Sequence, residues 1–291
     1  MSVSSGSRTV QPESSRARPL NSWSIEERQR VTTVFCDIDD TLTRDNRLEV
    51  SAFSAVWALA SAGYRVVPVT GRPAGWCDCI IRQWPVEAIV GENGAFTYYL
   101  VDGVRKELYH PEAGEPGAHN KQLRAIADDI YREIPGTREA KDQPFRQFDL
   151  AVDFREEPPF LDFAAAEGIH RLFTEAGAVA KISSIHVNAW IGDYDKRSMT
   201  EITARTLWNL DLSREDDRLS VAFCGDSPND EPMFSFFPNS VAVANVRETL
   251  DYISTPPVYI TESAHGAGFA ELADALVASR QADGGAEQHG L

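Results

Sequence analysis

Apolar residues fall into short runs along the chain, and the runs have two different spacings. Val31 to Cys36 is β-branched, aromatic and uncharged, which is typical of a strand buried on both faces of a parallel sheet. Glu49 to Ala62 has its large apolar side chains on one helical face, and Gly63 ends it. Two further apolar strands are expected at Arg65 to Val69 and at Ala88 to Val90. Strand, helix and strand with short joints predict a Rossmann-like, doubly wound parallel sheet.

The pattern changes after Phe96. Two short apolar stretches flank Asp102-Gly103, which predicts a hairpin over Phe96 to Tyr109. Helical spacing returns at 119–134 and 163–173, and strands are expected near 145–154, 179–182 and 185–190. A block of about 90 residues that mixes hairpins with helices indicates an inserted α/β domain. Gly94 and Gly192 stand at its edges as candidate hinges.

The parallel-sheet pattern returns after the insertion. A helix is expected from Lys196 to Leu207, a buried strand from Leu219 to Cys224, a short strand from Ser240 to Val243, and a final helix around Phe269. We therefore expect an α/β protein with a core at 31–95 and 192–279 and an inserted α/β cap at 96–191. Polar, Ser- and Arg-rich residues 1–22 and Gly-rich residues 280–291 are expected to be a disordered leader and tail.

Composition narrows the class of protein. Of the 291 residues 43% are hydrophobic and 25% charged, as in soluble globular proteins, and no apolar run approaches the roughly 20 residues of a membrane span. The net charge of −16 argues against nucleic acid as a partner and requires local positive charge wherever an anionic substrate enters. Four cysteines are no disulfide framework and favour free thiols in a reducing cytoplasm. The oligomeric state stays open.

Three carboxylates follow the first strand: Asp37, Asp39 and Asp40. Strand residues two apart point the same way, so Asp37 and Asp39 can face one cleft at the carboxyl edge of the sheet. Two acids this close repel each other by a few kcal/mol unless a cation or a proton intervenes. Mg²⁺ is the simplest cation, because it takes oxygen ligands and works beside phosphate.

The acidic segment has two other interpretations. It resembles the start of an EF-hand, but the glycine position holds Leu42, the twelfth position holds Leu48, and a strand leads in where an EF-hand has a helix. A solvated acidic turn is the better interpretation of Asp-x-Asp alone. The remainder of the chain decides between a turn and a site.

Other expected strand ends are also polar. Thr70-Gly71 follows the second strand, Gly225-Asp226 follows the fourth with Asn229-Asp230 just beyond it, and Lys196 begins the helix before that strand. Each alone has an ordinary structural explanation: Lys196 as a solvated lysine, Thr70-Gly71 as a turn, Asp226 and Asp230 as groups that favour a helix N-terminus. Parallel strands bring these ends to one edge, and the combination favours a site.

The four segments D-I-D-D-T-L-T, V-T-G-R-P, D-K-R-S-M and G-D-S-P-N-D, in this order, resemble the haloacid dehalogenase superfamily of aspartate-nucleophile phosphatases. The resemblance covers roughly residues 31–278. An insertion between the second and third segments, and E-N-G-A after the third strand, are similar to subfamily IIB, which includes phosphosugar phosphatases. Asp40 replaces the usual glycine. Aspartate tolerates left-handed backbone, so the turn is expected to survive.

The resemblance implies roles for individual residues. Asp37 would be the nucleophile, and Asp39 would protonate the leaving group and then activate water. The Asp37 carboxylate, the Asp39 carbonyl and Asp226 would hold Mg²⁺, and Asp230 would steady them. The phosphoryl group would be bound by the Thr70 hydroxyl and amide, by Gly71 beside it, and by Lys196.

Charge supports this assignment independently. A phosphate dianion entering among these acids meets several like charges, each worth about 4 kcal/mol at 4 Å for an effective dielectric constant near 20. Lys196 alone does not offset that repulsion, and neither does a metal ion alone, but the two together do. The metal is therefore expected to be obligatory.

The substrate-reading residues are less firmly indicated. Candidates on or near the expected cap strands are Arg146, Lys181, His186 and Asn188, and those bordering the core site are Arg72, Asn93 and Asn229. Surface ion pairs for Arg146 and Lys181, and a satisfied interior position for His186, are equally good interpretations.

The most favoured function is a Mg²⁺-dependent phosphatase of a small phosphate monoester, with a sugar phosphate as the favoured substrate. A sugar phosphomutase of the same fold and a catalytically silent binding protein are the alternatives. D-K-R favours the mutase, while G-D-S-P-N-D and the intact acids favour the phosphatase. A dehalogenase is disfavoured, because that chemistry has no need of Asp39 as an acid.

Overall fold

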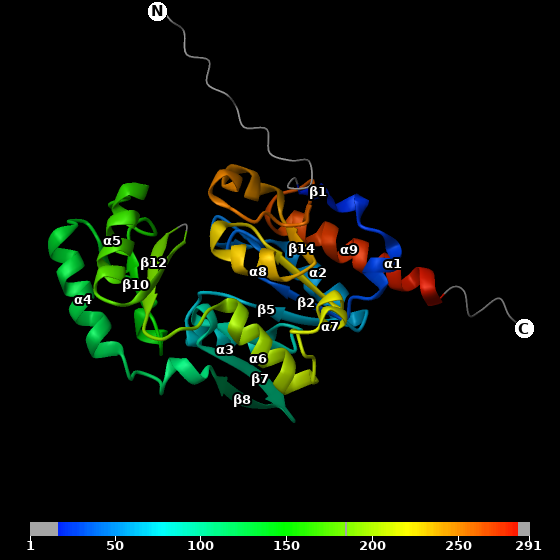
Figure 1. The fold of residues 1–291 in the computed structure, drawn as a ribbon, viewed down its shortest axis with the longest axis horizontal. Coiled ribbons are helices and arrows are strands. Elements are labelled where there is room, and N and C mark those ends of the chain that lie inside the picture. Colours follow the sequence, from blue (N-terminus) through cyan, green and yellow to red (C-terminus); the bar gives the residue numbers. More distant parts are fainter. Residues whose placement is uncertain (1–16, 184, 285–291) are drawn as a thin grey trace, which may run out of the picture.

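The computed structural model describes residues 17–183 and 185–284, and places a parallel-sheet core beside an antiparallel cap sheet (Figure 1). This confirms the predicted α/β fold with an inserted cap sheet. In spatial order the core sheet is β1 (Arg18–Pro19), β15 (Tyr259–Ile260), β14 (Asn239–Ala242), β13 (Val221–Gly225), β2 (Thr33–Cys36) and β5 (Arg65–Pro68). Every neighbouring pair is parallel, so all six strands end at one edge.

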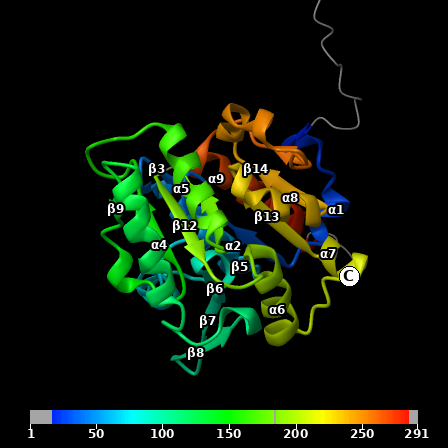
Figure 2. The same cartoon turned by 60° about the vertical axis from the view of Figure 1, so that its left-hand side comes forward.

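Helices cover both faces of this sheet, and alternate residues of β2 show why. Val34 and Cys36 join an apolar cluster with α2 (Val50–Ser61), α3 (Ala74–Gln83) and α9 (His265–Gly284). Phe35 joins a second cluster with α6 (Lys196–Trp208) and α8 (Glu231–Phe236) on the opposite face. Figure 2 shows α8 in front of the sheet and α9 behind it. Successive side chains of a strand point to opposite faces, so a strand buried on both sides must be apolar throughout.

The third expected strand, at Ala88 to Val90, was predicted to join the parallel sheet but pairs mainly with the strand that follows it. β6 (Ala88–Gly91) meets the parallel sheet through a single bridge, between Val69 and Val90, and pairs fully with β7 (Phe96–Val101) in an antiparallel ladder. The chain reverses directly through a 3₁₀ turn at Glu92–Gly94, which leaves β7 beside β6. The predicted hairpin to β8 (Val104–Tyr109) is confirmed. It extends β6, whereas we had assigned it to the cap.

The cap sheet has the order β11 (Val179–Ile182), β12 (His186–Trp190), β10 (Leu150–Asp153) and β9 (Arg138–Glu139), and all its pairs are antiparallel. Helices α4 (Asn120–Glu133) and α5 (Phe163–Glu175) pack on it around an apolar cluster of its own. The strand expected at 145–154 begins only at Leu150, because a 3₁₀ turn occupies Gln143–Phe145 and the residues after it contact the core. The exact division of the chain into domains stays a prediction.

The structure corrects the expected disorder of residues 17–22 and 280–284, which take part in the fold. β1 pairs with β15, and Leu20 and Trp23 are buried, because these apolar side chains complete the core cluster. At the other end α9 runs to Gly284, and the Arg280 guanidinium donates to the Ala62 carbonyl at 2.5 Å. The leader at 1–16 and the tail at 285–291 lie outside the described residues.

The remaining elements are short. They are the hairpin β3 (Thr43–Arg44) and β4 (Arg47–Leu48), the helices α1 (Ile25–Gln29) and α7 (Glu215–Leu219), and 3₁₀ turns at Leu20–Ser22, Pro111–Ala113, Pro228–Asp230, Ala244–Glu248 and Leu250–Tyr252. The β3–β4 hairpin follows the acidic motif directly. We did not predict it, because two-residue strands carry no periodic pattern.

Gly94 and Gly192, the expected hinges, each lie where two segments of the backbone pass in close contact. Both have left-handed backbone, with φ of 109° and 121°. A Cβ on Gly94 would overlap the backbone carbonyl of Asp195, and one on Gly192 would overlap that of Glu112. Each glycine therefore lets two connecting segments pass in contact.

Replacement of Gly94 by alanine tests this packing. Gly103 is the matched control, because it has a φ of 74° but no neighbouring atom within 4 Å of its would-be Cβ. Gly103→Ala should lower the free energy of unfolding by about 1 kcal/mol, from backbone strain alone. Gly94→Ala adds overlap with packed backbone and should cost about 3 kcal/mol. Urea unfolding measures both, and equal losses would contradict the packed crossing.

Candidate active site

Asp37 and Lys196 meet at the carboxyl edge of the core sheet. Asp37 directly follows β2, its N–H donates to the Cys224 carbonyl of β13 at 2.9 Å, and the residue is 4% exposed. Lys196 is the first residue of α6, which Asp195 caps by accepting a hydrogen bond from the Ser198 N–H at 2.8 Å. The Lys196 Nζ lies 3.0 Å from Asp37 Oδ2. The predicted nucleophile and the predicted phosphate-binding lysine therefore lie within ion-pair distance of each other.

Two further acids complete a cluster around them. Carboxylate oxygens of Asp37, Asp226 and Asp230 all lie within 4.8 Å of one another, and all three residues are buried. Asp226 follows β13 and accepts from the Thr41 hydroxyl at 2.8 Å. Asp230 Oδ2 accepts from the Asp226 N–H at 3.0 Å, and its Oδ1 lies 3.0 Å from Lys196 Nζ. Hydrogen bonds thus fix the orientation of each carboxylate.

The charges of the cluster do not balance. Burial raises the pKa of Asp37 to about 7 against the attraction of Lys196, and burial with Asp230 nearby raises the pKa of Asp226 well above its usual range. Burial alone would lower the pKa of Lys196, but Asp230 and Asp37 raise it, so the ammonium stays charged. With all three carboxylates ionised, one ammonium would leave two negative charges uncompensated, and the raised pKa values reflect that cost. An all-oxygen donor set with that charge fits a hard divalent cation such as Mg²⁺.

Asp39 is held apart from this cluster by Arg72. The Arg72 Nε lies 3.0 Å from both carboxylate oxygens of Asp39, and its Nη2 lies 2.6 Å from Oδ1. The guanidinium carbon is 4.4 Å from the centre of the Trp76 ring. The Asp39 side chain is 31% exposed, whereas that of Arg72 is 6% exposed. Asp39 therefore faces the cleft from a fixed position.

The structure corrects one expected contact of Thr70. Its backbone N–H, which we had assigned to the phosphoryl group, donates to the Val90 carbonyl at 2.9 Å. This bond joins β5 to β6 at the single bridge between them, so the amide is already used. The Thr70 hydroxyl accepts from the Arg72 N–H at 3.0 Å. Thr70 is buried, and the neighbouring Gly71 lines the cleft.

Asp40 adopts left-handed backbone with φ of 57°, as we expected for a residue in place of glycine. Its carbonyl accepts from the Asn245 Nδ2 at 3.1 Å and lies 2.9 Å from the His265 Nδ1. Asn245 Nδ2 also lies 3.3 Å from Asp226 Oδ2. Sequence reasoning missed Asn245 and His265, because neither belongs to a motif and both reach the site only through folding.

The cleft lies between the core and the cap and encloses about 510 Å³, including the space at its mouth. All seven predicted substrate candidates line it: Arg72, Asn93, Arg146, Lys181, His186, Asn188 and Asn229. Ile182, Ser183 and Ile185, which we did not predict, also line it from the turn between β11 and β12. The assigned roles of all these residues stay predictions.

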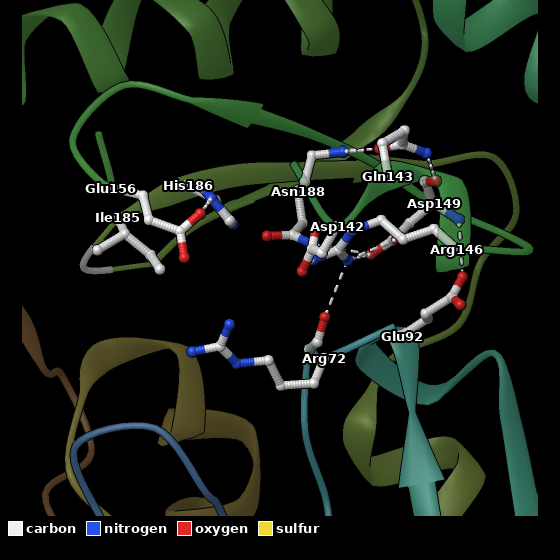
Figure 3. A network of polar contacts seen from close by, with 12 residues as sticks. Arg72, Glu92, Asp142, Gln143, Arg146, Asp149, Glu156, Ile185, His186 and Asn188 are labelled. Carbon is white, nitrogen blue, oxygen red and sulfur yellow. Dashed lines mark hydrogen bonds and ion pairs between the residues drawn. The ribbon is translucent and has the colours of Figure 1, made fainter. Parts of the chain in front are cut away.

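Most basic side chains of the cleft already have an acidic partner. His186 Nε2 lies 2.9 Å from Glu156 Oε2 (Figure 3). Arg146 binds Asp142 and Asp149, which agrees with the ion-pair interpretation of this residue. Within the described part of the chain, Lys181 forms no ion pair.

Comparisons with known proteins agree with this geometry. A family model described as haloacid dehalogenase-like hydrolase matches residues 34–112, which include the segments around Asp37 and Thr70. No curated protein matches the chain in sequence.

Solved structures share the fold. The C-terminal domain of a C. albicans trehalose-6-phosphate phosphatase has a TM-score of 0.65 at 14% identity, covering 91% of this chain and 99% of that one. A Thermoplasma acidophilum protein has a TM-score of 0.65 at 17% identity, covering 84% and 98%. The Synechocystis sucrose-phosphatase, solved with sucrose and phosphate, has a TM-score of 0.58 at 15% identity, covering 85% and 98%. At these identities the likeness shows the fold.

Among the described residues no helix combines the length and apolarity needed to span a bilayer.

Metal binding should depend on pH, because protons compete for the same carboxylates. The pKa of Asp37 is raised to about 7, so this carboxylate carries a proton in mildly acidic solution, and the raised pKa of Asp226 acts in the same direction. Raising the pH removes this competition, so the apparent Mg²⁺ dissociation constant should fall at least roughly tenfold between about pH 6 and pH 8. Calorimetric titration measures it. Equal affinity at both pH values would contradict these carboxylates as the ligands.

Proposed function

We propose that this chain, whose residues 34–112 match the haloacid dehalogenase-like hydrolases, is a Mg²⁺-dependent phosphatase acting on a small phosphate monoester, with a sugar phosphate as substrate. The buried cluster of Asp37, Lys196, Asp226 and Asp230 at one end of a cleft supports this function most directly. An unbalanced pair of negative charges beside an ammonium suits a site that takes a divalent cation together with a phosphoryl dianion.

In the proposed reaction an oxygen of Asp37 attacks phosphorus, the phosphorus–oxygen bond to the alcohol breaks, and an aspartyl-phosphate forms. Asp39 gives its proton to the departing alkoxide and takes one from the water that then hydrolyses the intermediate. Lys196 holds Asp37 in place and offers its ammonium to the phosphoryl oxygens. Asp37, Asp226, Asp230 and the Asp39 carbonyl would hold Mg²⁺, which would supply further positive charge against those oxygens.

Arg72 competes with the substrate for Asp39. Its guanidinium donates to both carboxylate oxygens of Asp39, at distances from 2.6 to 3.0 Å. For Asp39 to exchange a proton with a leaving group, at least one of these bonds must loosen once substrate occupies the cleft. The Asp39 side chain is partly exposed toward the opening of the cleft, and the leaving group of the substrate would lie there.

A sugar phosphate is favoured by the polar wall of the cleft. Asn93, Asn188, Asn229 and Ser183 offer amide and hydroxyl groups that can bind sugar hydroxyls. Two of the similar structures are a trehalose-6-phosphate phosphatase and a sucrose-phosphatase. The four free cysteines support the proposed cytoplasmic location.

Substitution of the nucleophile tests the phosphatase. Hydrolysis of p-nitrophenyl phosphate with Mg²⁺ should fall by at least about a thousandfold in Asp37→Asn, since an amide oxygen is a poor nucleophile. Asp193→Asn is the matched control, because this exposed aspartate lies in the segment leading to α6 and outside the cleft. It should keep full activity. Phosphate release that survives in Asp37→Asn, or in excess chelator, would overturn the proposal.

A comparison of substrates tests whether the phosphate ester is a sugar phosphate. In a panel of phosphorylated metabolites, sugar phosphates should give kcat/KM values at least tenfold above those of phosphorylated amino acids and nucleotides, because the cleft wall offers hydrogen bonds to hydroxyl groups. If phosphorylated amino acids or nucleotides gave the higher kcat/KM values, the sugar phosphate would be rejected as the substrate, while the phosphatase activity itself would stand. Isomer interconversion on adding a bisphosphate, without phosphate release, would instead identify a mutase.

A further inference from the structure

A segment of the cap reaches down and docks on the core. It comprises residues 146–149, between the 3₁₀ turn at Gln143–Phe145 and β10. Phe148 is 4% exposed and belongs to the apolar cluster of the core, with its ring centre 5.9 Å from Phe96 and 5.4 Å from Tyr109. The cap is thus held by more than its two connections at 110–119 and 191–195.

Glu92 binds the backbone of this docking segment. It lies in the turn after β6, with left-handed backbone at φ of 43° and no exposed surface. Its carboxylate accepts hydrogen bonds from the N–H groups of Gln147, Phe148 and Asp149, at distances from 2.6 to 3.1 Å. It also accepts from the Ala74 N–H at the start of α3, at 2.9 Å. One buried core carboxylate therefore joins a core helix to the cap.

Neighbouring side chains extend the connection to the cleft walls (Figure 3). Arg146 Nη1 donates to the Gly71 carbonyl at 3.0 Å and to Asp149 at 2.9 Å. The Asp149 Oδ2 accepts from Asn93 of the core at 3.3 Å and from Asn188 of the cap at 2.9 Å. Asn93 and Asn188, from opposite walls of the cleft, are thus bound to one buried carboxylate.

Rotation of the whole cap would break these contacts together. It would leave the Glu92 carboxylate with the Ala74 N–H as its remaining donor and would take three backbone N–H groups away from their acceptor, and each lost hydrogen bond of a buried group costs free energy. The packed crossings at Gly94 and Gly192 oppose the same rotation. A mobile cap and this network do not fit together.

We propose that Glu92 is a positioning residue that pins the cap to the core, so that Asn93 and Asn188 keep a fixed separation across the cleft even without ligand. The side chain touches no reacting atom and acts only through the docking segment. This inference does not depend on the proposed phosphatase activity, since both tests below use the protein without substrate.

Hydrogen exchange of the unmodified protein is the first test. The amides of Gln147, Phe148 and Asp149 should exchange at least about a hundredfold more slowly than those of the exposed segment 162–164, because a buried carboxylate accepts from all three. Residues 162–164 lie at the start of α5, where backbone N–H groups have no acceptor within the helix. Exchange of the docking segment as fast as that exposed segment would overturn the pin.

Distance measurements between spin labels are the second test. Cys79 on α3 is exposed while the other three cysteines are buried, so it labels selectively, and Arg171→Cys on α5 adds an exposed cap position. This pair of labels should give one narrow distance distribution in the unmodified protein. The distribution should broaden in Glu92→Gln, because the side-chain amide N–H would face the backbone N–H groups of the docking segment and could not accept from them. Glu87→Gln, the same change at an exposed core position, should stay narrow.

The outcomes separate a pin from a general loss of stability. Broadening in Glu92→Gln with melting temperatures similar in the two glutamine variants supports the pin. Distributions equally narrow in both variants overturn it. If Glu92→Gln does not fold, the exchange rates of the unmodified docking segment decide the question alone.

Discussion

Uncompensated negative charge, buried at the carboxyl edge of the core sheet, is the constraint on which this structure depends. Asp37, Asp226 and Asp230 converge around a single ammonium, that of Lys196, in an environment where water cannot screen them. Such an arrangement lowers the stability of the fold by itself. It becomes favourable only when positive charge arrives, and a divalent cation bound by these carboxylates would supply that charge.

The fold holds this arrangement through ordinary local rules. β2 and β13 are parallel neighbours, so Asp37 and Asp226 leave the sheet side by side, and the residues before them are apolar because both faces are covered. Capping of α6 by Asp195 places Lys196 at its first turn. Rigid core elements thus carry the charged groups, while the cap contributes polar groups to the other wall of the cleft.

Sequence reasoning succeeded where the signal is local. The strand before Asp37, the turn at Asp40 and the helix from Lys196 follow from short patterns of apolar, acidic and capping residues. It failed where partners are distant. The use of the Thr70 amide by β6 could not be anticipated, because a sequence does not show which carbonyl lies opposite an amide. Nor could the role of Glu92, which reads as one more polar residue in a turn.

Location of a bound ion tests the central claim most directly. A crystal of the protein grown with Mn²⁺ in place of Mg²⁺ reveals the ion by its anomalous scattering. We expect one strong peak within coordination distance of carboxylate oxygens from Asp37, Asp226 and Asp230. A peak elsewhere, with these three carboxylates bound only to Lys196 and to one another, would contradict the account.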